Sequence, residues 1–143
     1  MPPLTIPVKK LDPEALLPTY AHPGDAGMDI YALERTVVPA GKSAKIRTGL
    51  AFEIPEGYVG LCWDKSGLSI NQSLKSLGGV LDAGYRGELI IGIFNLGSEE
   101  YVFEKHHKII QMLIQPVVLG NIVEVTEMSD SSRGQGGLGS TGK

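Results

Sequence analysis

The chain has 143 residues and a formal net charge of −3; 42% of its residues are hydrophobic and 20% are charged. These values fit one globular domain with a buried core and argue against binding nucleic acid through a basic surface. A single cysteine, Cys62, excludes an internal disulfide and offers no zinc spacing. Neither a secretory signal nor a run long enough to span a membrane is visible, so we expect an intracellular protein, cytoplasmic or, in a eukaryote, also nuclear.

Short apolar runs divided by glycine and proline are typical of β-strands. In chain order, strands are expected near residues 4–10, 27–33, 43–54, 58–64, 88–95, 108–118 and 122–127. One short helix is expected from residue 68 to about 74, because nineteen glycines disfavour longer helices. The pattern predicts an all-β domain over residues 1–129, of the sandwich, jelly-roll or barrel type, and a flexible glycine-rich C-terminal arm over residues 130–143.

Asp25 and Asp29 flank a glycine-containing turn at the start of the second expected strand. Two carboxylates so placed can hold the water shell of Mg²⁺, which takes oxygen ligands and keeps several waters. The simpler alternative is that both carboxylates stabilise the turn and the start of the strand.

Lys65, Ser66 and Gly67 lie between an expected strand and the expected helix. The N–H groups at a helix start, together with a neighbouring ammonium group, can bind a phosphate. Ser66 is equally suited to cap the helix, which is a role that needs no ligand.

Asp82 and Tyr85 belong to a glycine-rich hairpin that ends at Glu88. A carboxylate on a rigid hairpin can act as a general base toward a water molecule, and a tyrosine ring can stack on a sugar or a base. An aspartate in a hairpin turn is also commonplace without any such function.

Gln111 is a polar residue in the otherwise apolar strand expected at residues 108–118, so it needs a hydrogen-bond partner or a function. His106 and His107 are adjacent, so in a strand they point to opposite faces and cannot bind one metal together. Lys105 and Lys108 add positive charge in the same region.

Five of the last eleven residues are glycines, and Arg133, Ser140 and Thr141 lie among them. Successive N–H groups in such a segment can surround an anion while the arginine supplies a forked, charged clamp. This composition predicts a mobile arm that closes over a polyphosphate, and the alternative is a disordered tail.

Together these five clusters resemble, in order, the five signature motifs of the trimeric dUTPase family. The matching segments are residues 26–29, 65–68, 79–87, 108–111 and 133–142, and the third is the most specific. The resemblance implies a jelly-roll homotrimer with active sites at the subunit interfaces. It also implies hydrolysis of dUTP to dUMP and pyrophosphate, by water attack on the α-phosphorus, with Mg²⁺ bound by the triphosphate. Asp29, through water, and more weakly Asp25 would contact that ion.

The resemblance also assigns roles to single residues. Asp82 would orient and deprotonate the water, Ser66 would contact the α/β phosphates, and Gln111 would bond a phosphate oxygen or the water. Tyr85 would lie under the deoxyribose and leave no room for a 2′-hydroxyl, and the hairpin backbone would read the uracil edge. The remaining substrate-binding positions would be Lys65, Gly67, Gly79, Val80, Gly84, Arg133, Gly137, Leu138, Gly139, Ser140 and Thr141.

The sequence departs from the family pattern in three of the motifs. Lys65 stands where arginine is usual, so a bidentate contact becomes a point charge. His106-His107-Lys108 replaces Gly-Asp-Arg, and Leu138 replaces an aromatic residue over the uracil. Because leucine cannot stack on the base, we expect weaker closure of the arm and a higher KM than for a protein with an aromatic residue at this position.

Two other functions remain open at this point. One is a dCTP deaminase, or the bifunctional deaminase and dUTPase, which share the fold. The other is a non-catalytic regulator that binds nucleotide or a protein partner. A plain jelly-roll structural protein is a third possibility, which the five ordered motifs disfavour.

Overall fold

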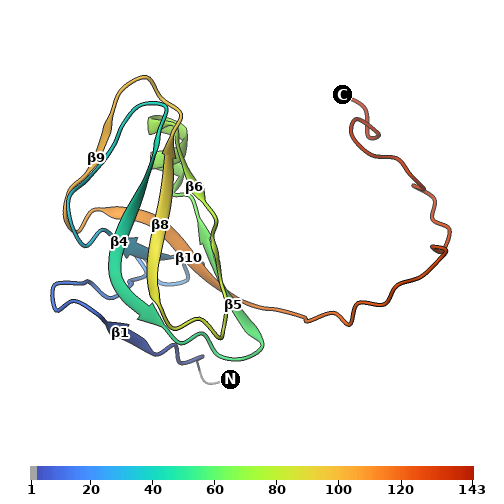
Figure 1. Ribbon diagram of the computed structural model, residues 1–143, viewed down its shortest axis with the longest axis horizontal. Coiled ribbons are helices and arrows are strands. Elements are labelled where there is room, and N and C mark those ends of the chain that lie inside the picture. Colours follow the sequence, from blue (N-terminus) through green and yellow to red (C-terminus); the bar gives the residue numbers. More distant parts are fainter. Residues whose placement is uncertain (1–2) are drawn as a thin grey trace.

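The computed structural model describes residues 3–143, and they form an all-β fold, as predicted (Figure 1). Its strands are β1 (Val8–Lys10), β2 (Met28–Tyr31), β3 (Thr36–Val38), β4 (Ser43–Phe52), β5 (Tyr58–Trp63), β6 (Leu74–Leu77), β7 (Val80–Leu81), β8 (Glu88–Asn95), β9 (Tyr101–Phe103) and β10 (Lys108–Pro116). One short helical turn, η1 (Gly67–Asn71), has π geometry. No helix among the described residues is long and apolar enough to cross a membrane.

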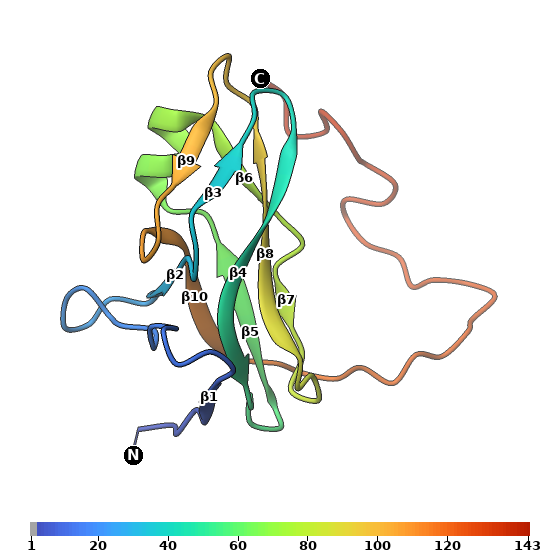
Figure 2. The ribbon, with the colours of Figure 1, turned by 60° about the vertical axis from the view of Figure 1, so that its left-hand side comes forward.

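Two four-stranded antiparallel sheets form the body, in the strand orders β1-β4-β8-β6 and β2-β10-β5-β7, and β3 pairs with β9 in a small third sheet. Ile46 and Ile91 from the first sheet join Ile110 and Met112 from the second in one buried cluster. The two large sheets lie around this cluster as a jelly-roll-like sandwich (Figure 2). Burial of this shared apolar face is the main stabilising contribution to the fold.

The longest predicted strands are confirmed, and only their ends differ. Residues 43–54, 58–64, 88–95 and 108–118 correspond to β4, β5, β8 and β10. The two earlier runs, 4–10 and 27–33, shrink to β1 and β2. The expected helix, from residue 68 to about 74, is corrected to the single turn η1, because Leu74 already begins β6.

The strand expected at residues 122–127 is wrong. No strand follows β10 in the described chain, and Ile122, Val123 and Val125 are 91%, 67% and 58% exposed. An apolar run becomes a strand only when its backbone groups find a neighbouring strand. This segment leaves the sandwich after Pro116 and extends away from it (Figure 1).

Candidate active site

A row of three side chains crosses the sheet that contains β10. Gln111 of β10 lies opposite Asp29 of β2 on one side and opposite Trp63 of β5 on the other. Directly opposed residues share a face of the sheet, and the next residue along β10, Met112, is buried in the core. The three side chains therefore lie on the outer face of the sheet. They bring the first motif (residues 26–29) and the fourth motif (108–111) next to Trp63, which shortly precedes the second motif (65–68).

Asp29 is bracketed by two lysines although its side chain is only 3% exposed. The Lys65 ammonium lies 2.5 Å from Oδ1, and the Lys108 ammonium lies 2.8 Å from Oδ2. Burial raises the pKa of Asp29, but the bonds from Lys108 and Lys65 outweigh it and leave the pKa below its usual value. One carboxylate between two ammonium groups leaves one surplus positive charge, which suits a phosphate ligand.

Gln111 has the partner that its burial requires. Its Nε2 donates a hydrogen bond to the backbone carbonyl of Asp64, at 2.9 Å. Gly27 lies against the other side of the amide, where an added Cβ would be 2.5 Å from Oε1. The side chain is thus held between the end of β5 and the segment before β2, and a larger residue at Gly27 would displace it.

Ser66 stands at the N-cap position of η1 but its side chain makes no capping hydrogen bond. The residue is exposed, so the hydroxyl is free to meet a ligand. The N–H groups of Leu68 and Ser69 donate to the carbonyl of Lys65. With a single turn of five residues, η1 contributes little dipole, so phosphate binding here would depend mainly on Lys65 and Ser66.

The hairpin after β7 carries Asp82 and Tyr85 on the surface. The Tyr85 N–H donates to the Asp82 carbonyl at 3.2 Å, which closes the turn, and the Tyr85 hydroxyl donates to the Glu88 carbonyl at 3.0 Å. An open cavity of about 250 Å³ lies beside them, lined by Val80, Leu81, Asp82, Tyr85, Glu88, Leu89 and Ile90. The hairpin thus places a carboxylate and an aromatic ring at one hollow.

Two glycines of this region have steric reasons to be glycine. Gly79 has φ +122°, and a Cβ there would lie 2.9 Å from the carbonyl oxygen of Cys62. At Gly87 a Cβ would collide with the phenol of Tyr85. Around Gly84 the space is open.

Asp25 occupies a turn of its own. Its Oδ2 accepts the N–H of His22 at 2.9 Å, and its own N–H donates to the His22 carbonyl. This is the turn-stabilising role that was the alternative to metal binding. His106 and His107 do not converge either, because one ring contacts the Glu14 carbonyl and the other accepts the N–H of Glu104.

The arm does not reach any of these groups within the chain. Arg133 Nε donates to the carbonyl of Gly136 at 2.7 Å, and Leu138 is fully exposed. Figures 1 and 2 show the segment after β10 running far from the sandwich. The arm positions named above, Arg133, Gly137, Leu138, Gly139, Ser140 and Thr141, therefore lie apart from the other predicted site residues.

The hairpin is also distant from the row on β10. β7 pairs with β5 through Leu81 and Gly60, whereas Gln111 lies opposite Trp63. Asp82 follows Leu81 in the direction that leads away from Trp63. Asp82 and Gln111 are therefore separated by about 10 Å or more along the strands, and by about 10 Å across them because β5 lies between β7 and β10. A single chain therefore presents two separate half-sites and an arm that touches neither. The lysine-bearing half-site contains Asp29, Lys65, Ser66, Lys108 and Gln111, and the hairpin half-site contains Asp82 and Tyr85.

Sequence reasoning missed the residues that support these half-sites. Asp64 holds Gln111 through its carbonyl, and its carboxylate accepts the N–H of Ser76 at 2.7 Å. Glu88 receives the Tyr85 hydroxyl. Both flank a motif in the sequence, and that adjacency was the only available signal.

The fold and the site together define the class of the protein. It is a jelly-roll-like protein in which a buried carboxylate lies between two lysines and a glycine-rich hairpin carries an aspartate. The sequence model of the dUTPase family matches residues 13–142. The chain belongs to the dUTPase family.

Curated relatives agree over nearly the whole chain. The deoxyuridine 5′-triphosphate nucleotidohydrolase of Clostridioides difficile is 47% identical, covering 94% of this chain and 96% of the relative. That of Alkaliphilus metalliredigens (strain QYMF) is 44% identical, with 96% of both chains covered. Such names give no support to the deaminase or to the non-catalytic alternative.

Solved structures share the fold. A mutant dUTPase of Staphylococcus bacteriophage 80alpha with dUpNHpp superposes with a TM-score of 0.91 at 34% identity, over 97% of this chain and 99% of that one. A mutant dUTPase from phage phi11 of S. aureus, described with a structural Mg(II) ion, gives a TM-score of 0.81 at 31% identity, over 87% and 98%.

Proposed function

We propose that this protein hydrolyses dUTP to dUMP and pyrophosphate by water attack on the α-phosphorus. The names of its relatives support the reaction, and the bound dUpNHpp of a structural neighbour supports the substrate. Within this chain the strongest support is the pairing of Gln111 on β10 with Asp29 on β2, because Asp29 also contacts the ammonium groups of Lys65 and Lys108.

The complete site is formed between copies of the chain. Asp82 as general base and Gln111 as a phosphate or water contact must both lie within hydrogen-bond reach of the reacting centre. Their separation within one chain is too large for that, so the hairpin of one subunit serves the lysine-bearing half-site of another. The arm of a further subunit closes over it, in a homotrimer.

The half-sites divide the chemistry. Asp82 deprotonates and aims the water, a contribution of about 10²–10⁴-fold for a well-placed base. Lys65, Ser66 and Gln111 bind the phosphates where negative charge develops, and Arg133 clamps them from the arm. Tyr85 lies against the deoxyribose and excludes a 2′-hydroxyl. Closure of the arm removes bulk water during the reaction and its opening releases product.

Magnesium fits this site as part of the substrate. The described residues contain no group of three His, Cys, Asp or Glu side chains that could hold a resident metal. Asp29 is already neutralised by Lys65 and Lys108, and Asp25 bonds to its own turn. Mg²⁺ would therefore arrive with the triphosphate, whose charge it neutralises. Asp29 remains the better candidate for a contact through water, because it lies beside the phosphate-binding lysines.

The test is pyrophosphate release from dUTP, dCTP, dTTP and UTP in the presence of Mg²⁺. We expect rapid release from dUTP alone, and loss of at least about 10²-fold in kcat for Asp82→Asn. Folded protein that releases pyrophosphate from none of the four would contradict the proposal. Ammonia release from dCTP would favour the deaminase instead.

A further inference from the structure

Strand β4 carries an irregularity where it runs beside the start of β8. Arg47 pairs with Ile90, and the next paired residue of β4, Ala51, lies opposite Glu88. Three residues of β4 therefore face a single residue of β8. Such a bulge bends the strand and redirects its side chains.

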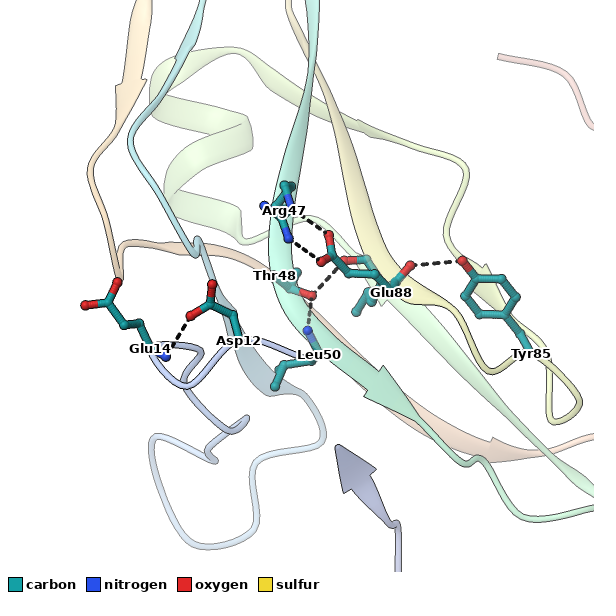
Figure 3. Close-up of polar contacts among 8 residues, drawn as sticks. Asp12, Glu14, Arg47, Thr48, Leu50, Tyr85 and Glu88 are labelled. Carbon is teal, nitrogen blue, oxygen red and sulfur yellow. Dashed lines mark hydrogen bonds and ion pairs between the residues drawn. The ribbon is translucent and has the colours of Figure 1, made fainter. Parts of the chain in front are cut away.

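The bulge is fixed by a buried hydroxyl. Thr48 is 1% exposed; its Oγ1 donates to the carbonyl of Leu89 at 2.7 Å and accepts the N–H of Leu50 at 3.2 Å (Figure 3). These bonds stand in for ladder bonds that the bulge interrupts. Gly49 has φ +69°, and a Cβ there would lie 3.0 Å from Ala15. The local backbone is therefore held in one conformation.

The consequence is a bidentate ion pair across the two strands. The Arg47 Nε lies 3.1 Å from Glu88 Oε2, and Nη2 lies 2.9 Å from Oε1 (Figure 3). The Glu88 side chain is only 16% exposed. A fork that meets both carboxylate oxygens fixes orientation as well as charge.

Glu88 passes this constraint to the hairpin. Its backbone carbonyl accepts a hydrogen bond from the Tyr85 hydroxyl at 3.0 Å (Figure 3). The tyrosine ring also lies against Gly87. Tyr85, Glu88 and Asp82 line the same cavity. Glu88 therefore holds Tyr85 through its backbone carbonyl, while its side-chain carboxylate is held by Arg47.

We propose that Arg47 is a positioning residue that, through Glu88, sets the orientation of Tyr85 and with it the discrimination between deoxyribonucleotides and ribonucleotides. Arg47 lies outside all five motifs. The inference rests on the proposed function, because it assigns Tyr85 to the sugar. This positioning role requires the two-pronged guanidinium contact with Glu88. A lysine at position 47 would therefore restore the charge but only part of the discrimination.

The chain supplies a matched control. Arg35, just before β3, forms an ion pair of 3.3 Å with Glu104, just after β9, and both side chains are more than half exposed. Neither residue lines the cavity beside Asp82. Arg35→Met therefore removes an Arg–Glu pair without touching the hairpin.

The experiment compares kcat/KM for dUTP and for UTP in wild type, Arg47→Met, Arg47→Lys and Arg35→Met, each checked for folding by thermal unfolding. We expect the dUTP/UTP ratio to fall about tenfold in Arg47→Met, by less in Arg47→Lys, and not in Arg35→Met. Equal ratios in Arg47→Met and Arg35→Met would overturn the proposal. In a Tyr85→Phe background, which lacks the hydroxyl, Arg47→Met should have no further effect, and full additivity would also overturn it.

Amide hydrogen exchange of residues 82–88 supplies a readout that needs no activity. Faster exchange there in Arg47→Met, but not in Arg35→Met, is expected because the anchor of the turn is lost. Unchanged exchange would overturn the positioning role even if dUTP is hydrolysed. Wild-type protein that fails to hydrolyse dUTP would refute the proposed function instead, and the exchange result would still decide whether Arg47 holds the hairpin.

Discussion

The amide nitrogen of Gln111 lies 2.9 Å from the backbone oxygen of Asp64, and this hydrogen bond joins β10 to the end of β5. The Asp64 carboxylate in turn accepts the N–H of Ser76 and contacts the ammonium of Lys75. One residue therefore links three strands at the edge of the phosphate-binding half-site. The loop with Lys65 and Ser66 begins at this anchor.

Asp64 makes stability depend on pH. Burial raises its pKa, but Lys75 and the Ser76 N–H outweigh burial and leave the pKa below the usual value. Because the pKa of Asp64 is lower in the folded than in the unfolded state, its ionised carboxylate stabilises the fold. This stabilisation is complete above the unfolded pKa, about 4, and is lost as the pH falls through the folded pKa. We expect Asp64→Asn to cost about 1–2 kcal/mol at neutral pH, and this cost to become smaller as the pH falls below about 4. Urea unfolding at neutral pH and at a series of pH values below about 4 checks this, with the exposed Asp130→Asn as control, and a cost that does not change with pH would contradict it.

Asp29 should matter for both stability and activity. Replacing it by asparagine removes the charge that holds Lys65 and Lys108, so we expect a loss of about 2 kcal/mol in the free energy of unfolding and a reduced kcat/KM. Asp25→Asn, in an exposed turn, should change stability by about 0.5 kcal/mol or less. Chemical denaturation of both variants distinguishes them, and equal costs would contradict a special stabilising role for the Asp29 carboxylate between the two lysines.

The arm should contribute to catalysis and not to folding. Residues 133–143 are exposed, and in the described chain their hydrogen bonds reach only one another and the neighbouring Ser131. Deleting them should leave the unfolding midpoint unchanged while kcat/KM for dUTP falls by at least about tenfold, the loss of one phosphate clamp. Parallel thermal and kinetic measurements test this. A destabilised but fully active truncation would reverse the assignment.

Leu138 should weaken closure of that arm. Its side chain is fully exposed in the open arm and can cover uracil only by apolar contact. We expect Leu138→Phe to lower KM by about threefold to tenfold, the gain of one aromatic contact worth about 0.5–1.5 kcal/mol. Steady-state kinetics with dUTP decide it, and an unchanged or raised KM would contradict the expectation.

The sequence was sufficient for the long strands and insufficient for the short ones. β4 and β10 are ten and nine residues long, whereas β7 has two residues and β3 and β9 have three each, too few to show a period. The run near Ile122 looked like a strand because apolar pattern says nothing about whether a neighbouring strand is present.

The site shows the same limit. Gln111 could be singled out because it is a polar residue in an otherwise apolar strand, whereas Asp82 and Lys65 could be chosen only because the ordered motifs contain them. The link from Arg47 to Glu88 could not, since it depends on a bulge that brings together residues forty-one positions apart. The lysine bracket around Asp29 likewise depends on the register of three strands.

The most direct test of a shared dUTPase site mixes two defective chains. Asp82→Asn destroys the hairpin half-site and Gln111→Ala the lysine-bearing half-site, so each variant alone should be inactive toward dUTP. Coexpressed in equal amounts, they should regain about one quarter of wild-type pyrophosphate release, the chance that two independently drawn chains supply both intact halves. A mixture no more active than its parents, beside an active wild type, would show that each site is built within one chain.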